Sequence, residues 1–296
     1  MSDDTDPSSL PAAPRPSRRR LLRNLAIGLA VPAGVAGYAR WVETFWPEFH
    51  ELALPIRNLP EAFEGLRIAH LTDLHVDGHV PAGYVRAVVE EVNRLGPDLV
   101  FITGDFVTRG RALIRESCEI VAAIRAPKYV SFGNHDYGRI TYDGRSVEVS
   151  DELERLLAGQ PRTTVLRNAA VPLMRGGARL WVVGMEDLWS GRFSPARAFA
   201  SVNSPDPVLA LSHNPDTAAA LDNYGVTWTL AGHTHGGQIR IPGYGAVLLP
   251  VHDRRLQAGP YDFPQSRLYI SRGIGYLAKL RFNCRPEIPI FTLTRV

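Results

Sequence analysis

The fold is decided by residues 66–105, which read LRIAHLTDLHVDGHVPAGYVRAVVEEVNRLGPDLVFITGD. This stretch begins with a short apolar run at 66–71 and ends with a second one at 98–103. Between them, apolar side chains recur at helical spacing over 84–95 and stop at Gly96-Pro97. Short, almost wholly apolar runs are typical of strands that are covered on both faces. The stretch therefore predicts a strand, a helix and a second strand of an α/β sheet.

The same pattern of short apolar runs continues along the rest of the chain. Further buried strands are expected at 129–132, 208–211 and 226–230. The middle of the chain adds strand-like runs at 162–166 and 180–184 and a helix that starts at 150–152, and short strands rich in Gly and Pro turns follow Gly236 and end at 288–293. No internal repeat is visible. We therefore predict one α/β domain.

Polar motifs follow five of the predicted strands. In chain order they are Thr72-Asp73-Leu74-His75, Gly104-Asp105, Gly133-Asn134-His135-Asp136, Ser212-His213-Asn214 and Gly232-His233-Thr234-His235, and they hold five of the nine histidines. The carboxyl ends of buried strands share one rim of an α/β sheet, where such sheets bind ligands. We therefore expect the five motifs to lie together.

The residue types in these motifs suit metal ions. Side chains two positions apart at a strand end point the same way, so Asp73 and His75 can hold one ion. A carboxylate such as Asp105 has two oxygens and can bridge two cations. His233 and His235 form a His-x-His pair with neighbouring glycines that leave room for a ligand. Each motif by itself also fits a plain polar turn, but the five together indicate a metal site.

Taken in this order, the motifs resemble the signature of calcineurin-like metallophosphoesterases. The resemblance covers residues 51–296 and implies a four-layer α/β/β/α sandwich. It also implies two divalent ions of manganese, iron or zinc, since mixed carboxylate, imidazole and amide ligands do not select among these metals. It assigns Asp73, His75 and His235 to one ion, Asn134, His213 and His233 to the other, and Asp105 to a bridge between them.

The resemblance implies a hydrolysis of phosphoric esters in which a hydroxide that bridges the two ions attacks phosphorus in line. His135 matches the residue that contacts the phosphoryl oxygen or protonates the leaving group without binding metal. Asp136 either orients the other ring nitrogen of His135 or is a plain turn acid. His135 and Asp136 are therefore the candidate catalytic residues.

Further segments narrow the resemblance. Residues 187–189, 232–238, 271–275 and 281–287, together with an arginine-rich leader, resemble exported phosphodiesterases of this family, which favours a phosphodiester substrate. The same proteins resemble UDP-2,3-diacylglucosamine pyrophosphohydrolases of lipid A synthesis, so a lipid-linked pyrophosphate is the alternative substrate. A non-catalytic exported protein that binds the cell surface or wall is a third reading.

The N-terminal segment has the composition of a targeting signal. Residues 1–16 hold four prolines and read as a disordered leader. Residues 17–40 begin Ser17-Arg18-Arg19 and continue with an uncharged stretch that contains Pro32, which predicts either a twin-arginine export signal or a membrane anchor. We expect the twin-arginine machinery as a partner, contact with the membrane through residues 21–46, and a catalytic domain on the periplasmic or extracytoplasmic side.

Composition excludes several other classes of protein. The formal charge is +3, and of 33 basic residues only Lys128 and Lys279 are lysines. The arginines are scattered and form no run inside the folded part, so no nucleic acid partner is expected. Cys118 and Cys284 can form one bridge at most, which excludes a disulfide-stapled fold and a cysteine zinc site.

Overall fold

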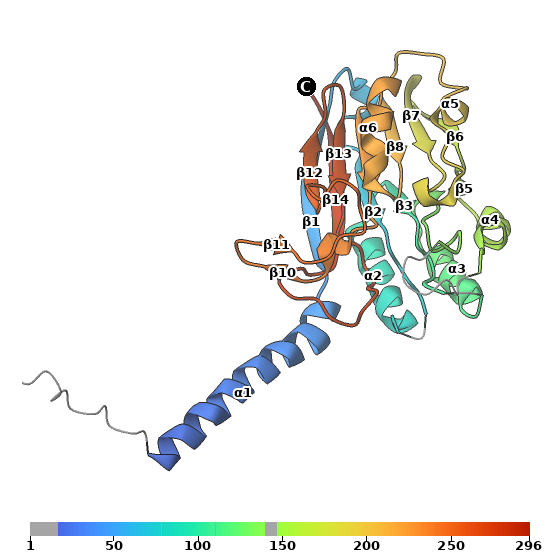
Figure 1. Ribbon diagram of the computed structural model, residues 1–296. Helices are drawn as coiled ribbons and strands as arrows, with labels where there is room; N and C mark the ends of the chain where they lie inside the picture. Colours follow the sequence, from blue (N-terminus) through green and yellow to red (C-terminus); the bar gives the residue numbers. More distant parts are fainter. Residues whose placement is uncertain (1–16, 78, 110, 140–146) are drawn as a thin grey trace, which may run out of the picture.

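The computed structural model describes residues 17–77, 79–109, 111–139 and 147–296, and two six-stranded sheets form its centre (Figure 1). The first sheet has the order β1 (Glu48–Ile56), β14 (Glu287–Arg295), β2 (Arg67–Leu71), β3 (Leu99–Thr103), β4 (Lys128–Ser131) and β5 (Thr163–Val165). The second has the order β12 (Gly259–Asp262), β13 (Arg267–Ile270), β9 (Trp228–Ala231), β8 (Val208–Leu211), β7 (Ala178–Gly184) and β6 (Ala169–Arg175). A small hairpin of β10 (Arg240–Ile241) and β11 (Gly245–Ala246) stands apart.

Each sheet has a parallel centre and at least one antiparallel pair. Strands β2, β3, β4 and β5 are parallel, while β14 runs antiparallel to β2. Strands β7, β8, β9 and β13 are parallel, while β6 and β12 are antiparallel to their neighbours. The parallel centres bring the carboxyl ends of β2, β3 and β4 to one edge of the first sheet, and those of β8 and β9 to one edge of the second.

Alternating side chains in the strands build two cores on opposite faces of each sheet. In β3, Val100 and Ile102 pack against the helices α2 (Ala82–Leu95), α3 (Ile114–Ala122) and α4 (Ser150–Ala158), whereas Phe101 packs between the sheets. In β8, Leu209 packs between the sheets and Ala210 packs toward the outer layer, which contains the short helices α5 (Pro195–Ala198) and α6 (Ala218–Leu221). The four-layer α/β/β/α sandwich predicted from the sequence is confirmed.

The strand, helix and strand expected over residues 66–105 are present. Helix α2 buries Val85, Val88, Val89 and Val92, and it ends at Gly96, whose φ of 61° is in the left-handed region that favours glycine. Burial of such a valine stabilises the fold by about 1.5–3 kcal/mol. Strand β1 has no counterpart among the expected elements, and it begins at Glu48, three residues before the domain start that we expected.

The N-terminal helix α1 (Arg18–Trp41) projects from the sandwich (Figure 1). It holds Pro32, and the Ser17 hydroxyl accepts a hydrogen bond from the Arg20 amide at its start. The helical segment 18–45 is long and apolar enough to cross a membrane, with a mean hydropathy of 1.3 and only 6% of its apolar window buried in the protein. A signal sequence meets the same criterion, so both expected readings of residues 17–40 remain open.

Candidate metal centre

The predicted motifs meet where the carboxyl edges of the two sheets join. Asp73 and His75 follow β2, Asp105 follows β3, and His213 follows β8. The Nδ1 of His213 lies 2.7 Å from the carbonyl oxygen of Thr103, the last residue of β3, so a hydrogen bond connects the sheets at this edge. All seven expected metal ligands are buried, each with an exposed fraction below 5%.

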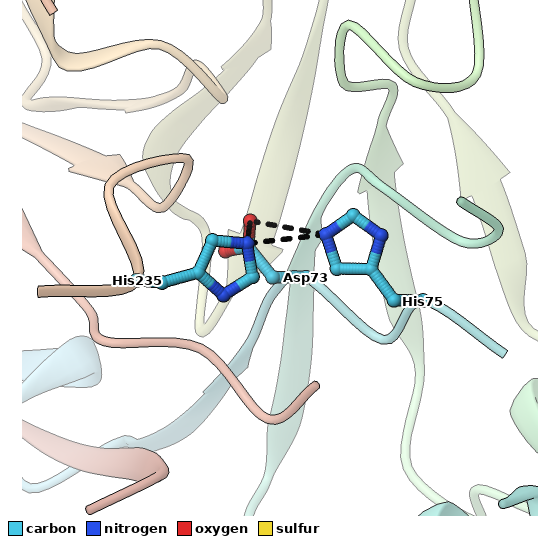
Figure 2. Close-up of side chains that lie close together, drawn as sticks. All are labelled: Asp73, His75 and His235. Carbon is cyan, nitrogen blue, oxygen red and sulfur yellow. Dashed lines mark hydrogen bonds and ion pairs between the residues drawn. The ribbon is translucent and has the colours of Figure 1, made fainter. Parts of the chain in front are cut away.

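Asp73, His75 and His235 form one cluster of donors (Figure 2). The Nε2 atoms of His75 and His235 are 3.2 Å apart, and Asp73 Oδ1 lies 3.3 Å from His235 Nε2 and 3.9 Å from His75 Nε2. Side chains at positions 73 and 235 are thus neighbours across the joined edges. The three residues that the resemblance assigned to one ion are brought together.

Asp105, His213 and His233 form a second cluster. His213 Nε2 lies 3.1 Å from Asp105 Oδ2 and 3.2 Å from His233 Nδ1. The resemblance assigned Asn134 to the same ion as His213 and His233. Its Nδ2 donates to the Arg139 carbonyl, and its buried Oδ1 has no hydrogen-bond partner among the described residues. A buried amide oxygen without a donor is unfavourable unless a cation or water completes it.

Asp105 connects the two clusters through one oxygen atom. Its Oδ2 lies 3.1 Å from His213 Nε2 and 3.5 Å from His75 Nε2, while its Oδ1 accepts a hydrogen bond from the His135 amide. We expected both carboxylate oxygens to be available for a bridge. In the structure only Oδ2 is directed at both clusters, because Oδ1 is taken by the backbone.

The backbone at the centre adopts a conformation that most side chains avoid. Asp73, His75, Asp105, His233 and His235 have φ between 48° and 69°. Aspartate and histidine tolerate the left-handed region better than most residues, and such values persist where surrounding structure enforces them. The turns direct both side chains of Asp73-x-His75 and of His233-x-His235 into the centre although neither pair lies in a regular strand.

Glycines make the close packing around the carboxylates possible. A Cβ at Gly133 would lie 2.2 Å from Asp105 Oδ1, and one at Gly232 would lie 2.3 Å from Asp73 Oδ2. Real Cβ atoms do not approach so closely, so any other residue at these positions would displace a carboxylate. The glycines that precede Asn134 and His233 in the motifs are therefore required by the donors opposite them.

Outer hydrogen bonds fix which nitrogen of each imidazole faces the centre. His213 Nδ1 bonds the Thr103 carbonyl and leaves Nε2 inward, whereas His233 Nε2 lies 2.8 Å from the Pro250 carbonyl and leaves Nδ1 inward. His75 Nδ1 is 3.2 Å from the Thr108 hydroxyl. Imidazoles that bind metals are commonly held in this manner by their second nitrogen.

Burial and mutual attraction set the charges of the centre. Burial lowers the pKa of His75 and of His233 to about 3, so both imidazoles are neutral and offer lone pairs. Burial opposes charge on Asp105 and His213 as well, but their attraction prevails: the pKa of Asp105 is held well below its ordinary value and that of His213 is raised to about 10. A divalent cation bound here would displace the proton of His213.

His135 lies next to the clusters, with its Nε2 3.9 Å from Asp105 Oδ2 and its Nδ1 2.9 Å from the Thr108 carbonyl. The Thr108 carbonyl, and not Asp136, bonds Nδ1 of the His135 ring, so of the two alternatives for Asp136 the contacts favour the turn acid. The Asp136 carboxylate instead accepts hydrogen bonds from the amides of Asp105, Phe106 and Gly133. A carboxylate with two oxygens can collect amides from two adjacent turns, which here joins the ends of β3 and β4.

A cavity of about 360 Å³ opens onto the centre. Trp189 lines it, and its ring meets that of His233 edge to face at 4.6 Å. Tyr276 is buried in the helix-side core. Cys118 and Cys284 are both free and buried. The backbone amides of His252 and Asp253 bind Asp216, and neither residue lines the cavity.

Two residues at the centre were not identified from the sequence as site residues. Thr108 serves His135 through its carbonyl and His75 through its hydroxyl, and no pattern in the sequence reveals a backbone contact. Asp187 is fully buried, and its Oδ2 has no hydrogen-bond partner in the described chain; burial raises its pKa to about 6. Its position after β7 was a usable signal, because the other motifs also follow strands.

The donor set fits two divalent cations. It combines three neutral imidazoles, two carboxylates, one charged imidazole and an orphaned amide oxygen, which suit manganese, iron or zinc. Asp105 of the second cluster also lies 3.5 Å from His75 of the first, and the carboxylates supply the negative charge that two cations require. The chain therefore has the side chains that a dinuclear centre needs.

Comparisons with known proteins show which proteins this chain resembles. The model of the family "Calcineurin-like phosphoesterase" matches residues 66–237. Phosphodiesterase YaeI of Escherichia coli is 33% identical over 94% of this chain and 99% of the relative, and the metallophosphoesterase YkuE of Bacillus subtilis is 30% identical over 94% and 97%. UDP-2,3-diacylglucosamine pyrophosphatase LpxG of Chlamydia trachomatis is 28% identical over 78% of this chain and 85% of the relative.

Proposed function

The chain belongs to the calcineurin-like phosphoesterase family, and from that premise we propose that it is a phosphodiesterase that works with two divalent cations. The observation that carries the proposal is the shared oxygen of Asp105, which faces His75 in one donor cluster and His213 in the other. The resemblance to phosphodiesterase YaeI over nearly the whole of both chains favours a diester over a monoester.

In this proposal Asp73, His75 and His235 hold one cation, Asn134, His213 and His233 hold the other, and Asp105 serves both. Two bound cations would supply the electrophilic clamp on a phosphoryl group and the acidification of a water that this chemistry needs. The protein's own part is to fix seven donors before substrate arrives, which the buried turns and outer hydrogen bonds support.

His135 is the proposed catalytic side chain that binds no metal. Its Nδ1 donates to the Thr108 carbonyl, and its Nε2 faces the space above Asp105. From there Nε2 can donate a hydrogen bond to a phosphoryl oxygen or a proton to the leaving alkoxide. Asp136 acts through the backbone as a positioning residue, because it holds the amides of Asp105 and Gly133.

A second candidate substrate is a lipid-linked pyrophosphate such as UDP-2,3-diacylglucosamine. The apolar wall of the cavity favours it, since Leu248, Leu249, Leu277 and Leu280 line the space beside the donors and could contact acyl chains. The relative LpxG carries that activity in its name. A nucleotide-activated lipid precursor is met on the cytoplasmic face, so this candidate needs a catalytic domain that stays inside.

We propose the opposite location for the phosphodiesterase. Residues 17–23 read SRRRLLR and precede an apolar helix, as in a twin-arginine signal. The helix then either is removed after export or remains as an anchor with the domain on the extracytoplasmic side. Fusing residues 1–50 to a reporter that fluoresces in both compartments and fractionating the cells separates the two substrates by location.

The activity test uses the full chain, purified in mild detergent and loaded with manganese, iron or zinc. We expect turnover of bis(p-nitrophenyl) phosphate and about two metal ions per chain by elemental analysis. Asp105→Asn removes the shared charge and should lower both turnover, by at least about 100-fold, and metal content. Asp262→Asn is the matched control, since Asp262 is 83% exposed on β12 and pairs only with Arg267 among the described residues.

Turnover that is equal in the wild type and in Asp105→Asn would remove the enzyme reading. Metal binding without turnover of any aryl diester or of UDP-2,3-diacylglucosamine would favour the non-catalytic surface or wall binder. Turnover of the glycolipid alone would select the pyrophosphatase candidate.

A further inference from the structure

Beside the metal cavity, the β10–β11 hairpin and the loop after Tyr276 expose large apolar side chains. Tyr244 is 70% exposed and Leu248 is 68% exposed. With Ile241, Val247 and Leu277, which are also exposed, they form what we call the apolar rim. A contiguous exposed apolar patch of this kind usually marks a contact with a partner or a membrane.

The hairpin is built to hold its tip outward. Its turn is Ile241-Pro242-Gly243-Tyr244, in which Gly243 has a φ of 78° and the Tyr244 amide bonds the Ile241 carbonyl. Proline followed by a glycine of positive φ is the pattern of a type II turn, which is conformationally restricted. Ile241 and Tyr244 are therefore presented by a defined turn.

The hairpin is fastened to the loop that carries Leu277. The Gln238 side chain donates to the carbonyls of Ala278 and Leu280 and accepts from the Leu277 amide. The Arg240 amide bonds the Phe282 carbonyl, and the Phe282 amide bonds the Gln238 carbonyl. These bonds fix both parts of the apolar rim relative to each other.

The same loop is fastened to the end of α1. The Arg281 amide donates to the Ala39 carbonyl, and Arg40 Nη1 lies 3.2 Å from the Lys279 carbonyl. Lys279 Nζ lies 5.0 Å from the centre of the Phe45 ring. The helix therefore leaves the protein at the apolar rim, and the hairpin projects from the same side of the molecule (Figure 1).

Several basic side chains lie near the rim. Arg240 is in the hairpin and Lys279 in the loop after Tyr276, Arg40 of α1 reaches that loop, and Arg254 Nη2 is 3.5 Å from the Val247 carbonyl. The nearby acid Glu43 is buried and accepts a hydrogen bond from the Cys284 amide. Apolar side chains surrounded by arginine and lysine fit the headgroup region of an anionic bilayer.

We propose that the apolar rim docks on the lipid surface next to the point where α1 enters the membrane. The continuity of the rim with the only described helix long enough to span a bilayer selects a lipid occupant. Leu248 and Leu277 belong both to the rim and to the wall of the metal cavity, so docking places the cavity mouth at the bilayer interface. Two exposed tryptophans stand at the end of α1 and just after it, Trp41 and Trp46, and tryptophan favours the interface of a bilayer.

The test uses the full chain in vesicles of phosphatidylethanolamine and phosphatidylglycerol. Tyr244→Cys is labelled with the fluorophore NBD; Cys118 and Cys284 are buried, which directs the label to the introduced thiol. We expect lipid carrying a nitroxide at acyl carbon 5 to quench this label at least twofold. Met174→Cys is the matched control on the far strand β6, where the apolar side chain is 58% exposed, and it should not be quenched.

A Tyr244 label that the nitroxide lipid quenches no more than the Met174 label would overturn the proposal. A label that is shielded from aqueous iodide but not reached by the nitroxide lipid would also overturn it, because a second copy or another protein would then cover the rim.

A second experiment tests the docking through activity, and it rests on the proposed function. Ile241→Ser/Tyr244→Ser alters the rim without touching the cavity lining. We expect unchanged turnover of soluble bis(p-nitrophenyl) phosphate and at least a fivefold loss with a long-chain aryl phosphodiester embedded in the vesicles. Equal loss on both substrates contradicts a docking role. If the wild type hydrolyses neither substrate, the proposed function fails while the quenching result still decides on the lipid contact.

Discussion

Asp105 is the residue on which the centre depends, because its single free oxygen faces both donor clusters. The backbone amide of His135 holds the other oxygen, and Asp136 holds the backbone amide of Asp105 itself. The carboxylate is thus fixed on both sides by the β4 turn. A short side chain in a buried turn can keep this geometry, since few of its rotamers are open.

Replacing His135 should separate catalysis from metal binding. In His135→Asn the proton donor near the leaving group is lost, while the donors of both clusters remain. We expect kcat to fall about 100- to 10,000-fold with metal content unchanged by elemental analysis. Loss of one ion would contradict this and would make His135 a ligand, as its place near His75 and Asp105 also allows.

His70 gives the fold a dependence on pH. Burial, followed by the charge of His213, lowers the pKa of His70 to about 3, from an ordinary value of 6.5. A neutral buried histidine contributes its full stability above pH 6.5 and loses it as pH falls toward 3, because the unfolded chain then binds the proton more tightly. One such group changes the free energy of unfolding by about 1.4 kcal/mol per pH unit.

We therefore expect His70→Leu to reduce the slope of unfolding free energy against pH by about one proton below pH 6. Denaturant titrations between pH 7 and 4.5, in the presence of a chelator, measure this slope. His79→Leu is the control, since the His79 side chain is 82% exposed. An unchanged slope in His70→Leu would show that His70 is not neutral in the fold.

At the scale of elements, the turns that follow the strands have an unusual backbone conformation and tight packing, and both are needed to place the donors. Five donors have a positive φ, and glycines at 133 and 232 stand opposite carboxylates where no Cβ fits. Regular strands would point alternate side chains to opposite faces. The left-handed turns instead collect donors from both sheets at one point.

Gly133→Ala should therefore disable the site through sterics alone. The new Cβ would meet Asp105 Oδ1 at 2.2 Å and the Asp105 amide nitrogen at 2.7 Å. Displacing Asp105 by about 1 Å should lower turnover about 100-fold and weaken metal binding, as calorimetric titration with manganese would show.

Gly83→Ala is the matched control for that substitution. Gly83 lies in α2 with nothing within 4 Å of its added Cβ, so alanine should leave turnover unchanged and raise stability by up to about 1 kcal/mol. Turnover retained in Gly133→Ala would mean that the β4 turn can move away from Asp105.

At the scale of the whole molecule, α1 stands outside the sandwich but is attached close to the site. Glu43 binds the Cys284 amide, and Cys284 Sγ lies 3.3 Å from the carbonyl of His235. The segment between α1 and β1 is therefore packed against a loop that supports a donor. Removing residues 43–47 together with the helix would expose that loop.

Export should depend on the arginine pair that begins α1. Arg18→Lys/Arg19→Lys keeps the charge of the segment but changes the twin-arginine motif. We expect the protein to accumulate in the cytoplasm, where protease added to spheroplasts does not reach it. Unimpaired export would show that the helix is delivered by another route, and a cytoplasmic domain in the wild type would restore the lipid A candidate.

The sequence by itself determined the central strands of both sheets, the residue types at their ends and their order along the chain. Local periodicity is a property of neighbouring residues, so β3, β8 and α2 could be predicted from their own segments. Strand β1 was not predicted, because its burial is uneven and its parallel partner β14 lies about 240 positions away. A one-dimensional pattern contains no sign of such a pairing.

Only the tertiary structure decided what each donor faces. His213 meets the Thr103 carbonyl across 110 positions, and Asp136 holds backbone amides where a contact with His135 was one of two alternatives. The joining of the hairpin, the loop at 277–282 and α1 is of the same kind. Backbone carbonyls and amides are present at every residue, so only the packing of the two sheets determines which of them a side chain reaches.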